Sequence, residues 1–345
     1  MSNFWKDKTI LVTGVCGTVG RELLNQLASF NCRQIRGIDN NESELFFLGN
    51  EFRDCANVNV RLCDIRDFDS LERNFRGVDI VIHAAALKHV GLCEDAPRQA
   101  VNTNITGVLN IINAAESNQV ERVIFTSSDK AVNPTNVMGA SKLMGERLFS
   151  ASHVGQGSNR RTIFSSTRFG NVLGSRGSVI PLFQKQIEKG GPVTLTDPGM
   201  SRFIMTLEES VALVLSSVHM ACGGEVFVTK MPVINISDLA EVMVEELAPS
   251  FGYQASDIRI EVTGAKFGEK LYEELMSEEE KNRTIELESF FVVKPPFVEL
   301  EPANPSAYGP VISETLEKPY NSRFEDKMSK GQLRSYLRQH KLIKG

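Results

Sequence analysis

The 345-residue sequence lacks any hydrophobic run close to the roughly 18 residues that a membrane-spanning helix needs. Its first eight residues contain no apolar core long enough for a signal peptide. Neither sign of charge dominates, because 38 Lys and Arg residues stand against 43 Asp and Glu residues, giving a net charge of −5. This mildly acidic balance disfavours nucleic acid as the main ligand. We therefore expect a cytoplasmic protein that binds neither nucleic acid nor a membrane.

Paired cysteines and early tyrosines are also missing. The six cysteines have irregular spacings without a C-x-x-C pair, which disfavours a structural zinc site or a disulfide framework, so we expect reduced thiols and no metal. The first 250 residues contain no tyrosine, since the five tyrosines are Tyr253, Tyr272, Tyr308, Tyr320 and Tyr336. Catalysis in that part of the chain would have to proceed without a tyrosine hydroxyl.

Short β-branched runs alternate with longer helical patterns over the first 170 residues. Strands are expected at 9–12, 34–38, 58–62, 78–83, 123–126 and 162–166, and helices at 21–30, 68–75, 101–118 and 139–151. Strands that are apolar almost throughout, with helices between them, predict a parallel sheet covered on both faces. The expected fold class is therefore α/β, with a doubly wound parallel sheet of the Rossmann type.

A glycine-rich turn follows the first expected strand. Its pattern is G-x-x-G-x-x-G, and it leads into a helix. Glycines permit the tight turn and a close approach of the backbone to a pyrophosphate, and the helix N-terminus faces the phosphates with its N–H groups. The residues expected to contact a dinucleotide here are Gly14, Cys16, Gly17, Thr18, Val19 and Gly20.

Three further strand ends are expected to complete the cofactor site. Asp39 closes the second strand 19 residues after Gly20, where a carboxylate accepts hydrogen bonds from the adenosine ribose and repels a 2′-phosphate, so we expect NAD. Arg36 and Asn40 lie close by and are the argument for NADP. The other expected contacts are Asp64 and Ile65 at the adenine, and Ala84, Ala85 and Ala86, whose small side chains leave room for the cofactor.

The regular alternation of strand and helix patterns ends at about residue 170, where Gly- and Pro-rich connecting segments begin. We expect residues 1–168 to form the NAD-binding Rossmann domain, with 204–228 returning to it. Residues 169–203 and 229–294 would form a smaller C-terminal substrate lobe. Residues 295–345 contain scattered prolines and are expected to form an extended arm that ends in a short helix.

The candidate catalytic groups follow the fifth expected strand. Ser128, Asp129 and Lys130 come directly after it, and Lys142 lies in the first turns of the next helix. Short-chain dehydrogenases usually carry Tyr-x-x-x-Lys in this place, whereas Met138 occupies the tyrosine position here. For an arbitrary Asp-Lys pair the ordinary alternatives are a helix N-cap and a surface lysine. The position beside the glycine loop favours catalysis instead.

The run S-S-D-K-A-V-N-P-T-N-V-M-G-A-S-K, at 127–142, resembles the nucleotide-sugar 4,6-dehydratases of capsule and flagellin-glycan synthesis, in the extended short-chain dehydrogenase/reductase superfamily. Within that group it is similar to the branch with methionine in place of tyrosine. Matching segments are 86–90, 168–175, 201–206 and 268–274, and the resemblance spans roughly Lys8 to Val293. It implies NAD-dependent conversion of UDP-N-acetylglucosamine to a UDP-4-keto-6-deoxy-N-acetylhexosamine for bacterial surface glycans, and a homo-oligomer.

Three departures from the family pattern stand out. Ser128 replaces a threonine common in the family but keeps the hydroxyl, and Lys266-Phe267 stands where the family has Arg-Pro before Gly268-Glu269. Many relatives carry an N-terminal membrane region, so we expect a free-standing soluble version here. The resemblance does not decide between a UDP-sugar and a GDP-sugar as the substrate. The branch with methionine favours retention of configuration at C5.

A 4,6-dehydration needs a hydride acceptor at C4, a base for the C5 proton and an acid for the C6 hydroxyl. We expect Lys130 to be the base, its pKa lowered by neighbouring positive charge and burial, and Asp129 to be the acid. Ser128, or a water held by Asp129, would take the C4 hydroxyl proton, since Met138 can only fill space. Lys142 would bond to the nicotinamide ribose.

Substrate contacts are expected from Lys88, Asn171, Arg202, Lys266 and Glu269. A solvated surface role is the alternative for Lys88 and Arg202, and a turn-stabilising role for Asn171. The competing functions are a nucleotide-sugar epimerase, for which an Asp-Lys pair would be superfluous, a GDP-sugar dehydratase, and a non-catalytic NAD-binding regulator.

Overall fold

The computed structural model describes residues 2–156, 162–264, 268–296 and 308–343. The chain forms two compact units. Unit 1 comprises residues 1–169, 211–229 and 277–319, and unit 2 comprises 170–210, 230–276 and 320–345. Each unit has its own sheet system.

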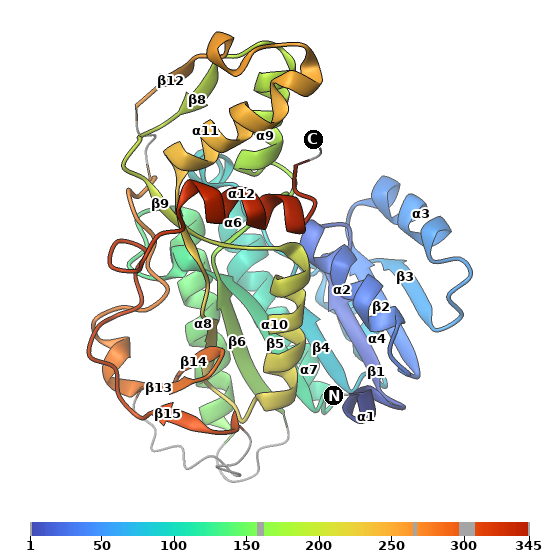
Figure 1. Cartoon of the computed structure of the whole chain (residues 1–345). Helices are drawn as coiled ribbons and strands as arrows, with labels where there is room; N and C mark the ends of the chain where they lie inside the picture. Colours follow the sequence, from blue (N-terminus) through green and yellow to red (C-terminus); the bar gives the residue numbers. More distant parts are fainter. Residues whose placement is uncertain (1, 157–161, 265–267, 297–307, 344–345) are drawn as a thin grey trace. The chain divides into compact units, whose positions relative to one another are not determined.

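Unit 1 is built on a ten-stranded sheet (Figure 1). Its strands, in spatial order, are β15 (Val311–Ser313), β13 (Thr284–Leu287), β14 (Phe290–Val293), β10 (Val226–Thr229), β6 (Ile163–Phe169), β5 (Arg122–Ser128), β4 (Ile80–His83), β1 (Thr9–Thr13), β2 (Gln34–Asp39) and β3 (Val58–Leu62). The seven strands from β10 to β3 are parallel, and β14, β13 and β15 continue the sheet in antiparallel pairs. The predicted doubly wound parallel sheet is confirmed.

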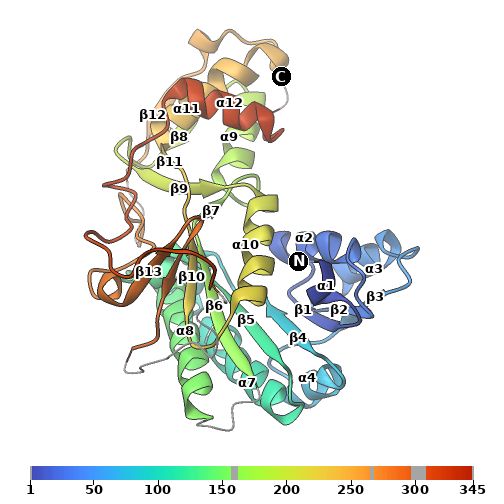
Figure 2. The same cartoon turned by 60° about the horizontal axis from the view of Figure 1, so that its bottom comes forward.

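Helices cover both faces of this sheet (Figures 1 and 2). One face carries α2 (Thr18–Ala28) and the part of α10 (Leu207–Met220) that belongs to unit 1. The other carries α4 (Phe68–Phe75), α7 (Gly107–Ser117) and α8 (Val137–Gly155), whose apolar sides pack on β1, β4, β5 and β6. All side chains of β1 and β4 are buried, as a sheet covered on both faces requires.

Shorter helical elements connect these parts of unit 1. They are α1 (Ser2–Trp5), α3 (Glu42–Glu51), α5 (Val90–Asp95), α6 (Pro97–Val101), the π-helical turn η1 (Asn102–Thr106), and the 3₁₀ turns η2 (Asp129–Ala131) and η5 (Glu280–Arg283). Of these, η2 and η1 bear on the candidate site described below.

Unit 2 contains two small sheets and three main helices. β9 (Ser201–Met205) lies between β11 (Val233–Asn235) and β7 (Asn171–Val172), and β8 (Val193–Leu195) pairs with β12 (Ile260–Val262). The helices are α9 (Val179–Glu188), α11 (Ile236–Leu247) and α12 (Lys330–Gln339), with short 3₁₀ turns η3 (Pro249–Phe251) and η4 (Ala255–Asp257). Their apolar faces form one core, in which Leu333 and Leu337 of α12 are fully buried.

The units differ from the expected domain boundaries in three segments. Residues 204–210, expected to return to the Rossmann domain, belong to unit 2. Residues 277–294, expected in the substrate lobe, belong to unit 1, because the apolar hairpin of β13 and β14 extends the sheet beyond β10 and buries Val292 and Val293 completely. Residues 295–345, expected to form an arm, divide between the units: β15 joins the sheet of unit 1, and α12 packs into the core of unit 2.

Candidate functional site

Three strand ends meet at one edge of the unit 1 sheet. β1, β4 and β5 are parallel neighbours, so the residues that follow them lie at the same edge. This edge gathers the glycine loop after β1, the alanine segment after β4 and the Ser128–Lys130 segment at the end of β5. The sequence alone placed these segments at strand ends, and the sheet order makes them neighbours.

The glycine loop leaves no room for a side chain at Gly14 or Gly20. Gly14 has φ +72°, and a Cβ there would stand 2.7 Å from the backbone N and Cα of Ala85. A Cβ on Gly20 would stand 2.1 Å from the Gly14 carbonyl oxygen. No side chain caps α2 at Gly17, so the positive end of the helix dipole faces the loop. This cradle fits the pyrophosphate of a dinucleotide.

The Asp39 carboxylate closes the loop from the end of β2. Its Oδ2 accepts a hydrogen bond from the Cys16 N–H at 3.0 Å, and its Oδ1 accepts one from the Asn41 N–H at 3.0 Å. Burial, together with the Asp39 charge, raises the pKa of the Cys16 thiol to about 12, so Cys16 stays a neutral thiol. Both Asp39 oxygens thus accept backbone hydrogen bonds near the glycine loop, and the expected contact of Asp39 with an adenosine ribose stays a prediction.

Asp64, after β3, is already engaged by protein groups. Arg66 donates to it from Nη2 at 2.6 Å and from Nε at 2.9 Å, which lowers the pKa of Asp64 to about 2. Ile65 is buried against the start of α7, where a Cβ on Gly107 would stand 2.7 Å from its Cδ1. The adenine contacts expected of these two residues stay predictions.

Thr13 and His83 hold the alanine segment in place. Thr13 Oγ1 accepts hydrogen bonds from the N–H groups of Ala84 at 3.2 Å and Ala85 at 3.1 Å, and it lies 2.7 Å from His83 Nδ1. Burial, with the charge of Lys142, lowers the pKa of His83 to about 3, so the ring is neutral. Because the oxygen already accepts two bonds, its proton is donated to Nδ1 and the ring hydrogen lies on Nε2. The His83 ring therefore acts as a hydrogen-bond acceptor that fixes the Thr13 hydroxyl.

Ser128, Asp129 and Lys130 form a tight hydrogen-bonded set. Asp129 is 1% exposed, and its Oδ1 accepts bonds from Ser128 Oγ at 2.5 Å, from the Lys130 N–H at 2.9 Å and from Lys130 Nζ at 3.1 Å. Its Oδ2 is buried without a hydrogen-bond partner among the described residues. A buried carboxylate oxygen left unbonded is costly in a structural role and indicates a functional one.

The first turns of α8 pack closely on this set. Asn136 caps the helix by accepting a bond from the Gly139 N–H at 2.8 Å. A Cβ on Gly139 would stand 2.2 Å from the Lys130 carbonyl oxygen, so only glycine permits the contact between α8 and η2. Met138 is 4% exposed and packs with Cys93 and Ala100 in a small apolar cluster. A thioether in this place offers no proton to a substrate.

Lys142 is buried and directed at β5. Its Nζ donates to the Thr126 carbonyl oxygen at 2.9 Å and lies 4.7 Å from the centre of the Phe125 ring. Burial lowers the pKa of Lys142 to about 8, and Glu146 partly opposes this effect. The lowered pKa expected for Lys130 stays a prediction.

Asn104 was missed from the sequence. It is 2% exposed within the π-helical turn η1, and it bonds the Leu87 N–H at 2.8 Å, the Leu87 carbonyl at 2.9 Å and Ser141 Oγ at 2.9 Å. It thereby ties the segment after β4 to α8. π-helical turns are frequent at functional sites, but the N-T-N-I-T run carries no sequence signal for one.

The expected substrate residues lie in different parts of the chain. Lys88 lies in the exposed segment after β4, and partial burial lowers its pKa. Asn171, Arg202 and Glu269 belong to unit 2, and Lys266 lies outside the described residues. Arg202 is 8% exposed, and it donates to the carbonyls of Ser201 and Lys270, both at 2.8 Å. Their substrate contacts stay predictions.

None of the described helices is both long enough and apolar enough to cross a membrane. Within the described residues, no three His, Cys, Asp or Glu side chains are grouped so that they could hold a metal ion.

Residues 10–295 match the family model described as polysaccharide biosynthesis protein. The chain is 51% identical over 318 residues to an uncharacterized membrane protein of Methanocaldococcus jannaschii, covering 92% of this chain and 95% of the relative. It is 38% identical to the UDP-N-acetylglucosamine 4,6-dehydratase (inverting) of Campylobacter jejuni, over 84% of each chain. It is 37% identical to the UDP-glucose 4-epimerase of Rickettsia akari, over 83% of this chain and 82% of the relative. The chain spans about half the length of two further relatives.

Solved structures share the fold. The crystal structure of Pen from Bacillus thuringiensis matches with a TM-score of 0.89 and 40% identity, covering 97% of this chain and 98% of that one. The dTDP-glucose 4,6-dehydratase DesIV of Streptomyces venezuelae, solved with NAD bound, matches with a TM-score of 0.64 at 22% identity, over 76% of this chain and 86% of that one.

Proposed function

Because the chain belongs to the polysaccharide biosynthesis protein family, we propose that it catalyses the NAD-dependent 4,6-dehydration of UDP-N-acetylglucosamine to a UDP-4-keto-6-deoxy-N-acetylhexosamine. Its relatives support the broader class of nucleotide-sugar dehydratases and 4-epimerases. The observation that carries the choice of dehydration is the buried Ser128–Asp129–Lys130 set, with one Asp129 oxygen unbonded. Elimination of water needs an acid and a base side by side, and an epimerase does not.

The residues that would hold NAD are those of the glycine loop, Asp39, Ala84, Ala85 and Lys142. The glycine cradle and the uncapped start of α2 fit its pyrophosphate, and the Asp39 carboxylate suits the ribose of NAD rather than a 2′-phosphate. The chemistry that NAD supplies when bound is reversible hydride acceptance.

Ser128 and Asp129 provide a route for the proton of the C4 hydroxyl. Ser128 Oγ donates to Asp129 Oδ1 at 2.5 Å, so a proton taken by the serine oxygen from the sugar is passed to the carboxylate. Asp129 then carries a proton that it gives to the leaving C6 hydroxyl, which departs as water. One proton thus moves from C4 to C6, and the tyrosine absent from this part of the chain is not required.

Lys130 is the proposed base for the C5 proton. Its side chain is 28% exposed beside the buried Asp129, so Nζ is the more accessible of the two groups. Lys142 orients the nicotinamide ribose and supplies positive charge. In this scheme Met138 fills the tyrosine position without taking part in proton transfer.

A homo-oligomer and a cytoplasmic location are further parts of the proposal.

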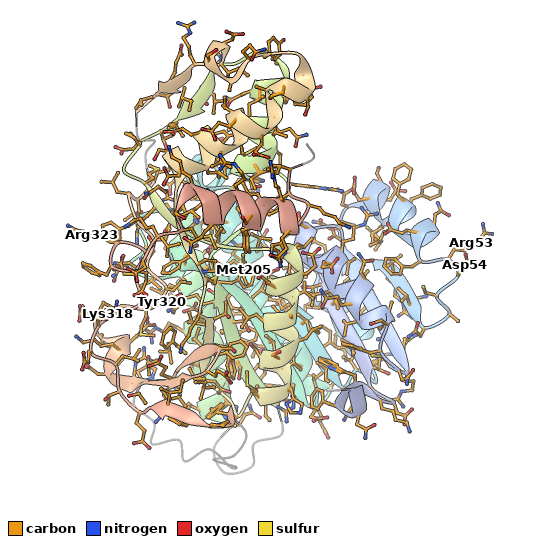
Figure 3. The ribbon with its side chains drawn as sticks, viewed as in Figure 1. Arg53, Asp54, Met205, Lys318, Tyr320 and Arg323 are labelled. Carbon is orange, nitrogen blue, oxygen red and sulfur yellow. The ribbon has the colours of Figure 1, made fainter. Side chains whose placement is uncertain are left out.

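The test is incubation of the purified protein with UDP-N-acetylglucosamine in D₂O, without and with added NAD⁺, followed by mass spectrometry and NMR. Loss of one water, with deuterium at C5 and a methyl group at C6, is the expected result. Asp129→Asn should lower kcat by about 10²–10⁴-fold, since it removes both the acceptor for the Ser128 proton and the acid. The matched control is Asp54→Asn, because Asp54 is exposed on the loop after α3, at the edge of the molecule in Figure 3.

The second candidate is a nucleotide-sugar 4-epimerase, favoured by the 37% identity to the Rickettsia akari enzyme. A product with altered configuration at C4, no loss of water and no deuterium at C5 would establish it and overturn the dehydratase proposal. No conversion of UDP-N-acetylglucosamine, UDP-glucose or a GDP-sugar would leave a non-catalytic NAD-binding protein.

A further inference from the structure

The ammonium group of Lys142 is buried. The residue is 6% exposed, and its Nζ donates to the Thr126 carbonyl oxygen at 2.9 Å. Among the described residues this carbonyl is the one hydrogen-bond acceptor that Nζ reaches. An ammonium group has three N–H donors, and a buried charge is costly unless its surroundings compensate it. One backbone carbonyl provides only part of that compensation, so the other neighbours of Nζ matter.

The second neighbour of this ammonium group is the aromatic ring of Phe125. Lys142 Nζ lies over the ring, 4.7 Å from its centre. Phe125 is 1% exposed on β5 and directly precedes Thr126, so the ring and the carbonyl that contact Nζ come from adjacent residues of one strand. The face of an aromatic ring is negative, and it attracts a cation within about 6 Å most strongly where water is excluded. The ring therefore stabilises the charged form of Lys142.

The Phe125 ring is held in this place by its packing against α8 and β4. A Cβ on Gly145 would stand 2.6 Å from the ring carbon Cζ, so glycine is needed for the ring to lie this close to the helix. Gly145 follows Lys142 by three residues, and both therefore face the ring from the same side of α8. The ring also stacks on His83, with ring centres 5.7 Å apart, and lies 5.3 Å from the ring of Phe149. It cannot turn away from Lys142 without displacing these neighbours.

We propose that Phe125 is a positioning residue for Lys142: the face of its ring keeps the buried ammonium group charged and fixed on the Thr126 carbonyl, where that group can hold the cofactor. The part that concerns the cofactor rests on the proposed function. The part that concerns the charge of Lys142 is a property of the protein alone.

The titratable groups on the elements packed around Lys142 are neutral or engaged with other partners. His83, at the end of β4, is neutral because burial and the charge of Lys142 lower its pKa to about 3. Asp129 in η2 accepts a hydrogen bond from Lys130 Nζ at 3.1 Å. Glu94 of α5 accepts one at 2.6 Å from the N–H of the first residue of α8. These groups leave the Phe125 ring as the neighbour that contacts Nζ beside the carbonyl.

Glu146, on α8 itself, also influences the charge of Lys142. Burial lowers the pKa of Lys142 to about 8, and Glu146 partly opposes this effect. Glu146 pairs with the fully buried Arg168 of β6 at 2.6 Å, and Arg168 also donates to Glu280 of η5 at 3.0 Å. Exchanges at Phe125 leave these charges in place, so a fall in the pKa of Lys142 after such an exchange reports the loss of the ring.

The experiment compares Phe125→Leu with Phe149→Leu. Both residues are buried in the same apolar core, and both exchanges remove a phenyl ring, but of the two rings only that of Phe125 lies under the ammonium group. The pKa of Lys142 is read in the protein without ligands, by NMR titration of lysines labelled with ¹³C at Cε, with the Lys142 signal assigned from Lys142→Arg. We expect Phe125→Leu to lower this pKa by about one unit and Phe149→Leu to leave it in place.

The sign of the shift separates the two ways in which the ring could act. If the ring only excluded water, its loss would let water approach Nζ, and the pKa of Lys142 would rise toward its ordinary value. A pKa at or above the wild-type value in Phe125→Leu, or an equal fall in both variants, therefore overturns the proposal.

Kinetics provide the second readout. If charged Lys142 holds the cofactor, activity falls as pH rises through its pKa, so the alkaline limb of the kcat/KM profile should move to lower pH in Phe125→Leu and not in Phe149→Leu. A lowered pKa in a protein that converts no nucleotide sugar would sink the proposed function and leave the Phe125 proposal standing. An unchanged pKa in an active enzyme would do the reverse.

A folding failure of Phe125→Leu is covered by Phe125→Met. The methionine side chain is long and flexible, so it fills more of the space that the ring leaves in the core, but it has no aromatic face. A fall in the pKa of Lys142 is expected here too, and a pKa at or above the wild-type value contradicts the proposal.

Discussion

The Thr13 hydroxyl is the point at which three parts of the candidate cofactor site are joined. It ends β1, bonds the N–H groups of Ala84 and Ala85, and donates to the buried ring of His83. The backbone of Ala85 in turn leaves no room for a side chain at Gly14. One hydroxyl therefore sets the spacing between the glycine loop and the segment after β4.

Thr13→Val keeps the shape of the side chain and removes these bonds. Two backbone N–H groups and the acceptor Nδ1 of His83 would be left buried without partners, so we expect a loss of about 1–3 kcal/mol in the free energy of unfolding and weaker NAD binding. Urea unfolding and calorimetric titration measure the two effects. Thr229→Val is the control, because it removes a single bond to the Ser289 carbonyl at 3.1 Å. Equal losses in the two variants would contradict this role of Thr13.

The residues that could be placed from the sequence lie at strand ends or in the first turns of the next helix. Asp39, Asp129 and Lys142 could be placed because the order of strand, turn and helix fixes which residues reach the sheet edge. Arg168 and Glu280 are 112 residues apart, and no local pattern links them. Asn104 depends on a π-helical turn that its neighbours in the sequence do not announce.

At the scale of elements, α12 is attached to unit 2 by two kinds of contact. Leu333 and Leu337 are fully buried in the core. On the exposed side, Arg334 pairs with Glu245 and, at 2.9 Å, with Glu246 of α11, and Arg338 pairs with Glu246 at 2.7 Å. Burial and exposed ion pairs differ in strength, so the two contributions can be separated.

We expect Leu337→Ala to lower the free energy of unfolding by about 2–5 kcal/mol, because it leaves a cavity in the core. Arg334→Gln should cost no more than about 1 kcal/mol, since the pair is partly exposed. Its cost should also vanish at about 1 M salt, whereas that of Leu337→Ala should persist. Urea unfolding at low and high salt tests this, and a salt-independent loss in Arg334→Gln would show that the arginine contributes through packing.

Elements that the sequence did not reveal have weak or mixed patterns. α3 exposes Phe46 and Phe47, which obscures an amphipathic stripe, although Asn41 caps its start. β13 and β14 are separated by two residues and pair with the sheet through β10, which lies more than 50 residues earlier in the chain. The central strands β1 and β4 are buried throughout and could be predicted from their apolar runs, whereas the position of this hairpin depends on which edge of the sheet is free.

At the scale of the whole molecule, the two units should respond differently to acid. His83 and Glu280 both belong to unit 1. Burial and the charge of Lys142 lower the pKa of His83 from 6.5 to about 3. Burial alone would raise the pKa of Glu280, but Arg168 lowers it from 4.5 to about 2. In unit 2, burial raises the pKa values of Tyr320 and Tyr336. These two groups therefore affect stability only at alkaline pH.

The direction of the pH dependence of stability follows from how many protons the folded and unfolded chains bind. Below about pH 6.5 the unfolded chain protonates His83 and the folded chain does not. The stability that His83 contributes above pH 6.5 is therefore lost as pH falls toward 3. Glu280 adds to the loss below pH 4.5. Between pH 6.5 and about 4.5 we expect unit 1 to lose about 2–3 kcal/mol through His83.

Urea unfolding followed by hydrogen exchange, corrected for intrinsic rates, should show β4 and β5 losing protection before α11. His83→Asn, which keeps an acceptor for Thr13 but does not titrate, should flatten the dependence over this range. If His83→Asn keeps the wild-type slope, or α11 opens first, the acid sensitivity has another source.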